Sequence, residues 1–419
     1  MNDTEQEPPL PQFSMTKSQL EASAAIGLTL LAFFLLPFGR AVNAPLALLA
    51  TWGVVLLIRH GAELWQRPSI RAMLIFVLCL WLPQFWALLH AADPARAWGS
   101  ALYYPCYALA GVPLLWLALR YEVEAMLLKG LLAIAVFWSL DALLQWIAGR
   151  DLLGYPYDGI RLQGIFYPKY SIGIVLAHLL PLLLAASYRL QRRSPIWNLM
   201  LLPVVATIVL SGTRTAMILM VLTFVLYSGW LVSRRLLSWR WVTAGAAALV
   251  ICIAAVLAAS PQTRQRFVEV QELGQMNIEA VNRATSLRGS VWLAALTIAK
   301  EHLTTGIGVR GYRKLIQEEG LADIDFAHPH FFALDVLVST GIFGLLAYLV
   351  AYLYFLARLY RYITTPKGFA GWLTSALAFL PINAHWSIYA SYTLALVWPL
   401  TTLGVLLILR NQEAPVTDP

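Results

Sequence analysis

Long apolar runs, repeated along most of the chain, limit how this sequence can fold more than any other feature. Runs of about 17–25 residues match a helix that crosses the hydrocarbon core of a bilayer. We count about twelve, centred near residues 30, 50, 80, 108, 136, 178, 203, 222, 249, 344, 380 and 401. Of the 419 residues, 59% are hydrophobic and 12% are charged, against about 25% charged in a soluble domain. The sequence therefore predicts an all-α, polytopic membrane protein.

The positions of Lys and Arg predict the side of the membrane on which each connection lies. If both termini are cytoplasmic, the short outer gaps after the first and third spans carry only Arg40 and Arg96. The inner gaps hold Arg59, Arg67, Arg71, Arg120, Lys129, Arg189, Arg192, Arg193, Arg234, Arg235, Arg240, Arg358, Arg361 and Lys367. We therefore divide the chain into spans one to nine over residues 1–259, a periplasmic loop over 260–330 and spans ten to twelve over 331–419.

Several other classes of protein are disfavoured. The net charge of +8 does not indicate nucleic-acid binding, because basic residues in a membrane protein first report its orientation. Cys79, Cys106 and Cys252 are scattered in apolar runs, which argues against a disulfide framework or a cysteine metal site. Residues 1–19 lack the basic region and cleavage site of a signal peptide, so we expect the first apolar run to be a retained helix.

The predicted outer loop is the one long polar interval of the sequence. It holds eight Lys or Arg and eight Asp or Glu, so it is neutral overall. Residues 263–281 and 287–301 place apolar residues among charges with helical periodicity, and Gly306, Gly308 and Gly311 then predict turns. A long loop with helices of its own is typical of a cap over a site.

Four arginines on the predicted outer side lie beside glycine or serine: Arg161, Arg214, Arg288 and Arg310. A guanidinium group suits bidentate capture of phosphate oxygens, and small neighbours let a phosphate approach the backbone. The alternative for each is an interfacial arginine that reaches lipid head groups. Arg214 is the strongest single candidate, because a charge at the start of an apolar helix is costly without a partner. Together the four predict a diphosphate site.

Two histidines, His328 and His330, flank Pro329 just before an apolar run. An imidazole is the usual base for a hydroxyl near neutral pH. The alternative is a helix-capping or interfacial histidine. A metal site also stays open, because Asp323 and Asp325 lie just upstream and carboxylates with histidine bind Mn²⁺ or Mg²⁺.

Four ionisable residues fall inside or beside predicted spans: Asp141, His178, Asp335 and His385. Such residues are rare in membranes and are often functional, and the competing explanation is a buried polar pair between helices. We favour pairing for His178 and His385. Asp335 lies somewhat more than one helical turn past His330 and is a candidate to orient a catalytic group.

The segment from His330 to Leu345 resembles the signature of the O-antigen ligase and polymerase superfamily. His330, Leu334, Leu337, Gly341 and Gly344 match at the spacings of that family. Further elements similar to its arginine motifs are Arg161-Leu-Gln-Gly164-Ile-Phe166-Tyr-Pro168, Ser211-Gly-Thr-Arg214-Thr-Ala216, and Arg288 followed by Trp292 and Gly306-Ile-Gly308. Phe331 and Lys169 stand where the family usually has Asn. That departure leaves the histidine to be oriented by another group, such as His328 or Asp335.

This resemblance implies a metal-independent glycosyltransferase without cofactors, in the inner membrane of a Gram-negative bacterium, with its active site facing the periplasm. The donor would be an O-antigen polysaccharide on undecaprenyl diphosphate, and the acceptor a sugar hydroxyl of lipid A–core. The resemblance implies His330 as the catalytic residue, Arg161, Arg214 and Arg288 as the diphosphate ligands, and His328, Arg310, Asp335 and Lys169 as supporting residues.

Three alternative functions share many of these features. An O-antigen polymerase or a protein O-oligosaccharyltransferase would use the same donor with another acceptor, and local motifs do not separate them. A lipid-linked glycan transporter would explain the spans and the arginines, but not a histidine at the entrance of a helix beneath a structured loop. Transport also predicts functional polar groups at mid-membrane depth, where Asp141 and few others qualify.

Overall fold

The computed structural model describes residues 16–191, 196–259, 282, 287–320 and 326–409. Within these ranges the chain is helical, with one isolated bridge between Arg150 and Pro156. The elements are α1 (Lys17–Phe34), η1 (Leu36–Val42), α2 (Asn43–Gln66), α3 (Pro68–Leu88), α4 (Pro94–Leu109), α5 (Val112–Ala118), α6 (Glu124–Ala148), η2 (Gly164–Phe166), α7 (Ile172–Gln191), α8 (Ile196–Leu199), α9 (Leu201–Leu210), α10 (Arg214–Ser233), α11 (Trp239–Ala259), α14 (Arg288–Glu301), α15 (Tyr312–Glu319), α16 (Phe332–Tyr360), α17 (Pro366–Ala378) and α18 (Ser391–Leu409).

Eight helical stretches of the described chain are long and apolar enough to cross a membrane. Three shorter apolar helices, Gln19–Phe34, Leu201–Leu210 and Trp239–Ala255, lie at three further predicted spans. The prediction of an all-α polytopic membrane protein is confirmed.

The span predicted near residue 380 differs from the structure. Helix α17 ends at Ala378, and residues 379–390, here called the turn segment, run irregularly to the start of α18. Pro381 explains the break, because proline cannot donate a helical hydrogen bond and clashes with the preceding turn. The apolar run was continuous in the sequence, but the helix is not. This break supplies part of the candidate site.

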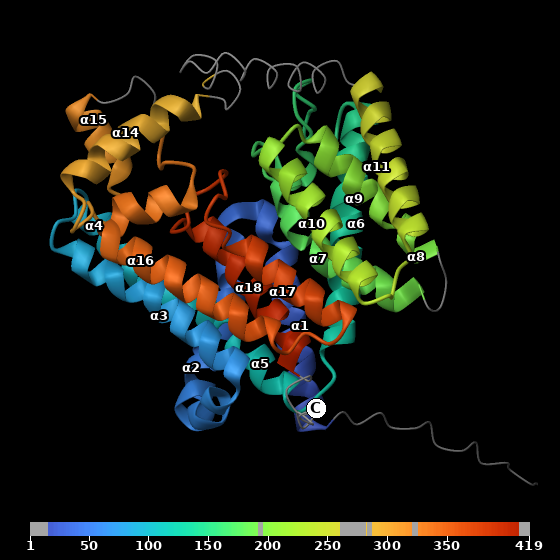
Figure 1. Cartoon of the computed structure of the whole chain (residues 1–419), viewed down its shortest axis with the longest axis horizontal. Helices are drawn as coiled ribbons and strands as arrows, with labels where there is room; N and C mark the ends of the chain where they lie inside the picture. The colour runs from blue at the N-terminus through green and yellow to red at the C-terminus, as the bar shows by residue number, and fades with distance from the viewer. Residues whose placement is uncertain (1–15, 192–195, 260–281, 283–286, 321–325, 410–419) are drawn as a thin grey trace, which may run out of the picture.

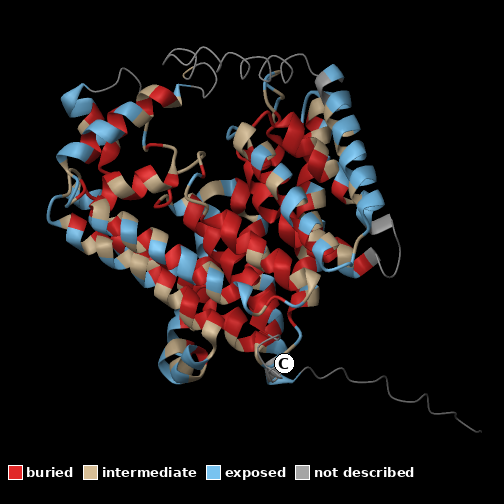
Figure 2. Ribbon diagram, viewed as in Figure 1, coloured by how far each residue is buried: buried red, intermediate tan, exposed pale blue. Residues whose placement is uncertain are grey.

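The centre of the bundle is built around α7 and α18. In their most apolar windows, 83% of α7 and 94% of α18 is buried. Helix α18 packs against α17, α4 and α5, while α7 packs against α6, α9, α10 and α17. A helix that is apolar on every side belongs inside a bundle rather than at its surface. Figure 2 shows buried residues gathered where these helices cross.

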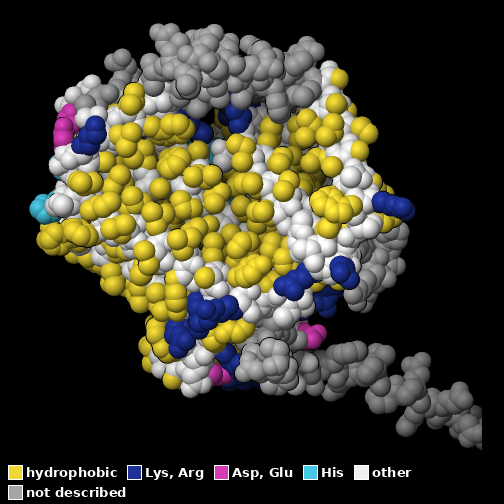
Figure 3. All heavy atoms as spheres, in the orientation of Figure 1, with side chains coloured by type: hydrophobic (Ala, Val, Ile, Leu, Met, Phe, Trp, Pro, Cys, Tyr) yellow, Lys and Arg dark blue, Asp and Glu magenta, His cyan; other side chains and the backbone are white. Residues whose placement is uncertain are grey.

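The end of the molecule that the charges predict to be cytoplasmic is tied together by ion pairs. Buried Glu124 on α6 accepts from Lys367 at 2.6 Å and from Arg189 at 3.3 Å, which links α6 to α17 and α7. Figure 3 shows Lys and Arg at this lower edge and a broad apolar surface above it. The opposite end is hollowed, and further Lys and Arg side chains are visible there.

A second, smaller core lies beside the first turns of α16 (Figure 1). It is formed by Val291, Ala294, Ala295, Ile298, Ala299, Ile307, Tyr312, Ile316, Leu334 and Val338. We call α14, α15 and the turn between them the cap. The helix predicted over residues 287–301 is present as α14, whereas the one predicted over 263–281 lies outside the described residues.

Two glycines let the cap turn lie directly on the backbone of α16. Gly306 has φ +65°, and a Cβ there would meet the backbone of Ser339 and Thr340. Gly341 has φ +70°, kinks α16, and faces the backbone of Thr304. Hydrogen bonds from Ile307 N to Val338 O (3.0 Å), Gly308 N to Ser339 O (3.0 Å) and Ile342 N to Leu303 O (2.7 Å) close the contact. Only glycine combines a positive φ with so close an approach.

Candidate functional site

The connection that carries Arg161 is fixed to α6 by two side chains. The Asp141 carboxylate accepts from the backbone N–H of Ile165 at 2.9 Å, and Gln145 accepts from Gly164 N–H at 2.8 Å. Asp141 also accepts a hydrogen bond from the backbone N–H of Leu152, near the start of the same connection. The buried carboxylate predicted at mid-span is therefore used to hold a loop.

Arg161 itself lies over an aromatic ring. Its guanidinium carbon is 5.0 Å from the centroid of Tyr170, and the Tyr170 hydroxyl donates to Asp158 at 2.7 Å. Burial raises the pKa of Asp158, but hydrogen bonds from the Arg161 N–H, Tyr170 and Ile160 outweigh it, so the pKa lies below its usual range. The ionised Asp158 thus fixes both the backbone and the ring beside Arg161.

Arg214 and Arg288 each stand at the first residue of a helix. Arg214 follows a turn in which Gly212 has φ +62° and Thr213 N–H donates to Ser211 Oγ at 3.3 Å. Arg288 follows Leu287, whose φ of +68° is uncommon for a leucine. A helix start presents free N–H groups and a positive dipole end, so both places favour an anion.

The structure brings these two arginines together. Both are half-buried, and burial together with the positive charge of Arg214 lowers the pKa of Arg288. Like charges held close in a partly desolvated place repel each other unless an anion lies between them. The pair is therefore a candidate site for an anion with several oxygens.

Trp292 connects Arg288 to the histidine segment. It lies one helical turn after Arg288 on α14, and its Nε1–H donates to the carbonyl oxygen of Pro329 at 3.1 Å. Its ring also meets Phe331 edge to face, with centroids 5.9 Å apart. Trp292 thus positions the residues on either side of His330.

His330 is oriented by a backbone carbonyl of the turn segment. Its Nδ1 is 2.6 Å from the carbonyl oxygen of His385. A carbonyl oxygen only accepts, so Nδ1 carries the proton and Nε2 is the basic nitrogen. The backbone of His330 has φ +52°, an uncommon conformation outside glycine, and its ring centroid is 4.0 Å from that of His328.

Burial keeps both histidines of the pair neutral. It lowers the pKa of His330 to about 4, the hydrogen bond to His385 opposes this, and the charge of Arg288 lowers the pKa further. The pKa of His328 falls to about 3 through burial and the charges of His330 and Arg310. At neutral pH His330 can therefore accept a proton.

Asp335 holds the turn segment rather than the imidazole of His330. Its carboxylate accepts from Ser387 Oγ at 2.6 Å and from Ile388 N–H at 3.0 Å. Neither His328 nor Asp335 is the group that bonds His330 Nδ1; the His385 carbonyl is. Asp335 holds the segment in which that carbonyl lies.

The turn segment is also tied to α7 and to the start of α16. The Asn383 Nδ2–H donates to His178 Nε2 at 3.2 Å, so the buried pair favoured for His178 is present. The Asn383 carbonyl accepts from Phe332 N–H at 3.1 Å, and the Pro381 carbonyl from Ala333 N–H at 3.0 Å. These bonds satisfy two donors that a helix start leaves open.

The remaining expected residues are distributed around this centre. Arg161 lies near enough to His385 to lower its pKa, and Arg310, with φ +69°, does the same for His328. Lys169 lies apart, with its Nζ 5.4 Å from the ring centroid of Tyr392. Asp323 and Asp325 lie outside the described residues, and the described part of the chain contains no group of three or more metal-ligating side chains.

A comparison with protein families matches the model described as O-antigen ligase to residues 199–349. The matched region holds Arg214, Arg288, Trp292 and His330, together with Gly341. A search of curated proteins finds no match.

Proposed function

We propose that this chain, in which residues 199–349 match the family model described as O-antigen ligase, transfers O-antigen polysaccharide from undecaprenyl diphosphate to a sugar hydroxyl of lipid A–core. The bond between the anomeric carbon and the diphosphate breaks, and a glycosidic bond to the acceptor oxygen forms. The hydroxyl proton passes to His330, and undecaprenyl diphosphate leaves. The reaction takes place at the periplasmic face of the inner membrane.

The three arginines bind the donor diphosphate in this proposal. Arg214 and Arg288 are already close enough to repel, and Arg161 and Arg288 both lie near His385. Negative charge grows on the diphosphate as the anomeric bond breaks. Fixed guanidinium groups in a water-poor site stabilise that charge more strongly than water does.

The hydrogen bond between His330 Nδ1 and the His385 carbonyl is the observation that carries the proposal. It leaves Nε2 as the base beside Arg288, where a leaving group would lie. The donor diphosphate offsets the positive charge of Arg288, and a nearby anion raises the pKa of an imidazole. His330 therefore becomes a stronger base when the donor is bound.

The buried polar groups favour an enzyme over a transporter. A transporter binds its cargo near mid-membrane through functional polar groups. Asp141 is engaged with the backbone of Ile165, and His178 with Asn383. The polymerase and the protein-directed transferase remain alternatives, since both would use the same donor site and the same base.

Reconstitution of the purified protein with lipid-linked donor and lipid A–core, with and without a chelator, tests the proposal. We expect transfer to lipid A–core, unaffected by the chelator. His330→Ala should lower the rate by about 10²–10⁴-fold, the usual contribution of a general base. His60→Ala, on α2 outside the site, is the matched control and should transfer normally. Wild-type transfer by a folded His330→Ala protein would exclude this base.

A further inference from the structure

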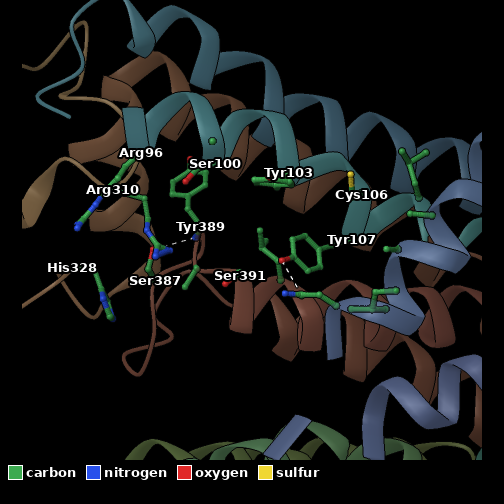
Figure 4. Close-up of a pocket in the computed structure, with 18 of the residues that line it drawn as sticks. Arg96, Ser100, Tyr103, Cys106, Tyr107, Arg310, His328, Ser387, Tyr389 and Ser391 are labelled. Atoms are coloured by element: carbon green, nitrogen blue, oxygen red, sulfur yellow. Dashed lines mark hydrogen bonds between the residues drawn. The ribbon is translucent and has the colours of Figure 1, made fainter. Parts of the chain in front are cut away.

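A cavity of about 1000 Å³ lies beside His328, between α2 and α4. Apolar side chains form its wall along the helices: Leu46, Ala47, Ala50, Val54, Leu109 and Leu394. Polar side chains gather at one end, where Figure 4 shows Arg96, Arg310 and His328 close together and Cys106 at the far end.

The polar end is positively charged. Arg96, Arg310 and Arg313 line it, and among the described lining residues Asp335 carries the only carboxylate. That carboxylate already accepts hydrogen bonds from Ser387 Oγ and from the backbone N–H of Ile388. Arg96 also pairs with Asp93, whose Oδ2 is 3.4 Å from its Nε. Among the described residues that line the cavity, three arginines face one carboxylate, which suits an anionic head group.

The position of Arg310 is built into the fold. Its φ of +69° is uncommon for a residue with a side chain, and the turn around it is fixed on both sides. Ala92 N–H donates to Ile307 O at 2.8 Å, and Lys314 Nζ donates to Ala92 O at 2.8 Å. Gly311 N–H donates to Gly308 O at 3.2 Å. Uncommon backbone held in this way is typical of binding sites.

The cavity reaches the candidate base through His328. His328 lines the cavity, and its ring centroid is 4.0 Å from that of His330. Arg161, Arg214 and Arg288 do not line it. The arginines that line the cavity are thus a different set from the three arginines of the proposed donor site, and both sets lie near the histidine pair.

We propose that this cavity binds the acceptor, an acylated lipid whose phosphorylated head group lies at Arg96, Arg310 and Arg313. Its acyl chains follow the apolar wall of α2 and α4, and a head-group hydroxyl reaches His330 past His328. This inference rests on the proposed function, which assigns the donor diphosphate to the other set of arginines. The volume of the cavity falls at the upper end of the range for ligand pockets, as a lipid head group with the first parts of its acyl chains requires.

Filling the cavity tests the proposal kinetically. Gly99 on α4 lines the cavity, and a Cβ added there meets no atom within 4 Å. Gly99→Leu should raise the KM for lipid A–core by at least about tenfold and leave the KM for the donor unchanged. Gly229→Leu, at an equally open helical glycine on α10, is the control. An unchanged acceptor KM in Gly99→Leu overturns the proposal.

The charge is tested with two acceptors, one phosphorylated and one with its phosphates removed. Arg310→Gln should raise the KM for phosphorylated lipid A–core by about tenfold, the usual scale for one charged hydrogen bond. With the dephosphorylated acceptor, the variant and wild type should have the same KM. An equal loss with both acceptors means that Arg310 does not bind the phosphate, and overturns that part of the assignment.

Photo-cross-linking separates this inference from the proposed function. Tyr103 lines the cavity and is 68% exposed, whereas its neighbour Leu102 is 60% exposed and does not line it. Benzoylphenylalanine at Tyr103, but not at Leu102, should capture lipid A–core without turnover. Capture of the lipid-linked donor at Tyr103, or of no acceptor, overturns the assignment. Failure of transfer by the wild type would instead refute the proposed function, since cross-linking does not depend on catalysis.

Discussion

Replacing Asp335 by Asn perturbs the orientation of His330 without touching its imidazole. One carboxylate oxygen of Asp335 accepts from both Ser387 Oγ and Ile388 N–H. Hydrogen bonds to a charged group contribute about 1.5–3 kcal/mol and neutral ones about 0.5–1.5 kcal/mol. Loss of the charge therefore weakens the hold on the turn segment by about 2–3 kcal/mol over the two bonds.

The weaker hold on the turn segment should lower kcat more than it lowers the melting temperature. If the His385 carbonyl leaves His330 Nδ1, about 2–3 kcal/mol corresponds to a 30- to 150-fold lower kcat. The neutral amide also removes the cost of burying a charge, so we expect the melting temperature to change by less than about 2 °C. KM values for both lipids should stay near those of wild type.

Steady-state transfer in proteoliposomes, with thermal unfolding of the same preparation, measures both quantities. Ser387→Ala is the matched control, because it removes one of the two bonds and keeps the charge; about a tenfold lower kcat is expected. If folded Asp335→Asn has a kcat within about threefold of wild type, the turn segment does not position the base by the route argued here.

Four further predictions concern the same region. The acid limb of the pH profile of kcat/KM should have its midpoint near the pKa of His330 in the free protein, about 4. The acid limb of kcat should lie at higher pH, because the bound diphosphate raises the pKa of His330. The reverse order would contradict the placement of the donor beside Arg288. The same depressed pKa means that neutral His330 stabilises the fold above pH 6.5, and melting temperatures should fall as pH drops from there towards about 4. Gly341→Ala should lower the melting temperature by several degrees through its positive φ and backbone contact, whereas Gly229→Ala should leave it equal or higher; both are read by thermal unfolding. Trp292→Phe keeps the ring but loses the bond to Pro329, and a several-fold lower kcat with unchanged lipid KM values is expected; equal kcat would show that this bond does not place the histidine.

The fold was largely predictable because membrane spans are encoded locally. Each span needs about twenty apolar residues in one stretch, so hydropathy alone locates it. The exception near residue 380 is instructive. Its apolar content satisfied the length criterion, but Pro381 and the polar residues after it form bonds to α7 and α16 that no local pattern contains.

The candidate site was predictable only where a side chain carries its chemistry. The spacing around His330 and the small residues beside the arginines were readable from the sequence. The carbonyl of His385 was not, because every residue has a carbonyl and only the fold brings this one to His330. The cavity residues Arg96 and Arg313 were also missed, since neither lies in a recognisable motif and α4 meets the cap turn only in three dimensions.

The contacts of Gly306 and Gly341 between the cap turn and α16 divide the candidate active site between two parts of the fold. Because the cap lies on the backbone of α16, Arg288 and His330 belong to one part. Arg161 and Arg214 belong to the other, which is built on α6, α9 and α10. In the proposed function, a diphosphate bound by Arg214 and Arg288 would connect the two parts, so that the reacting lipid itself would set the distance between its leaving group and the base.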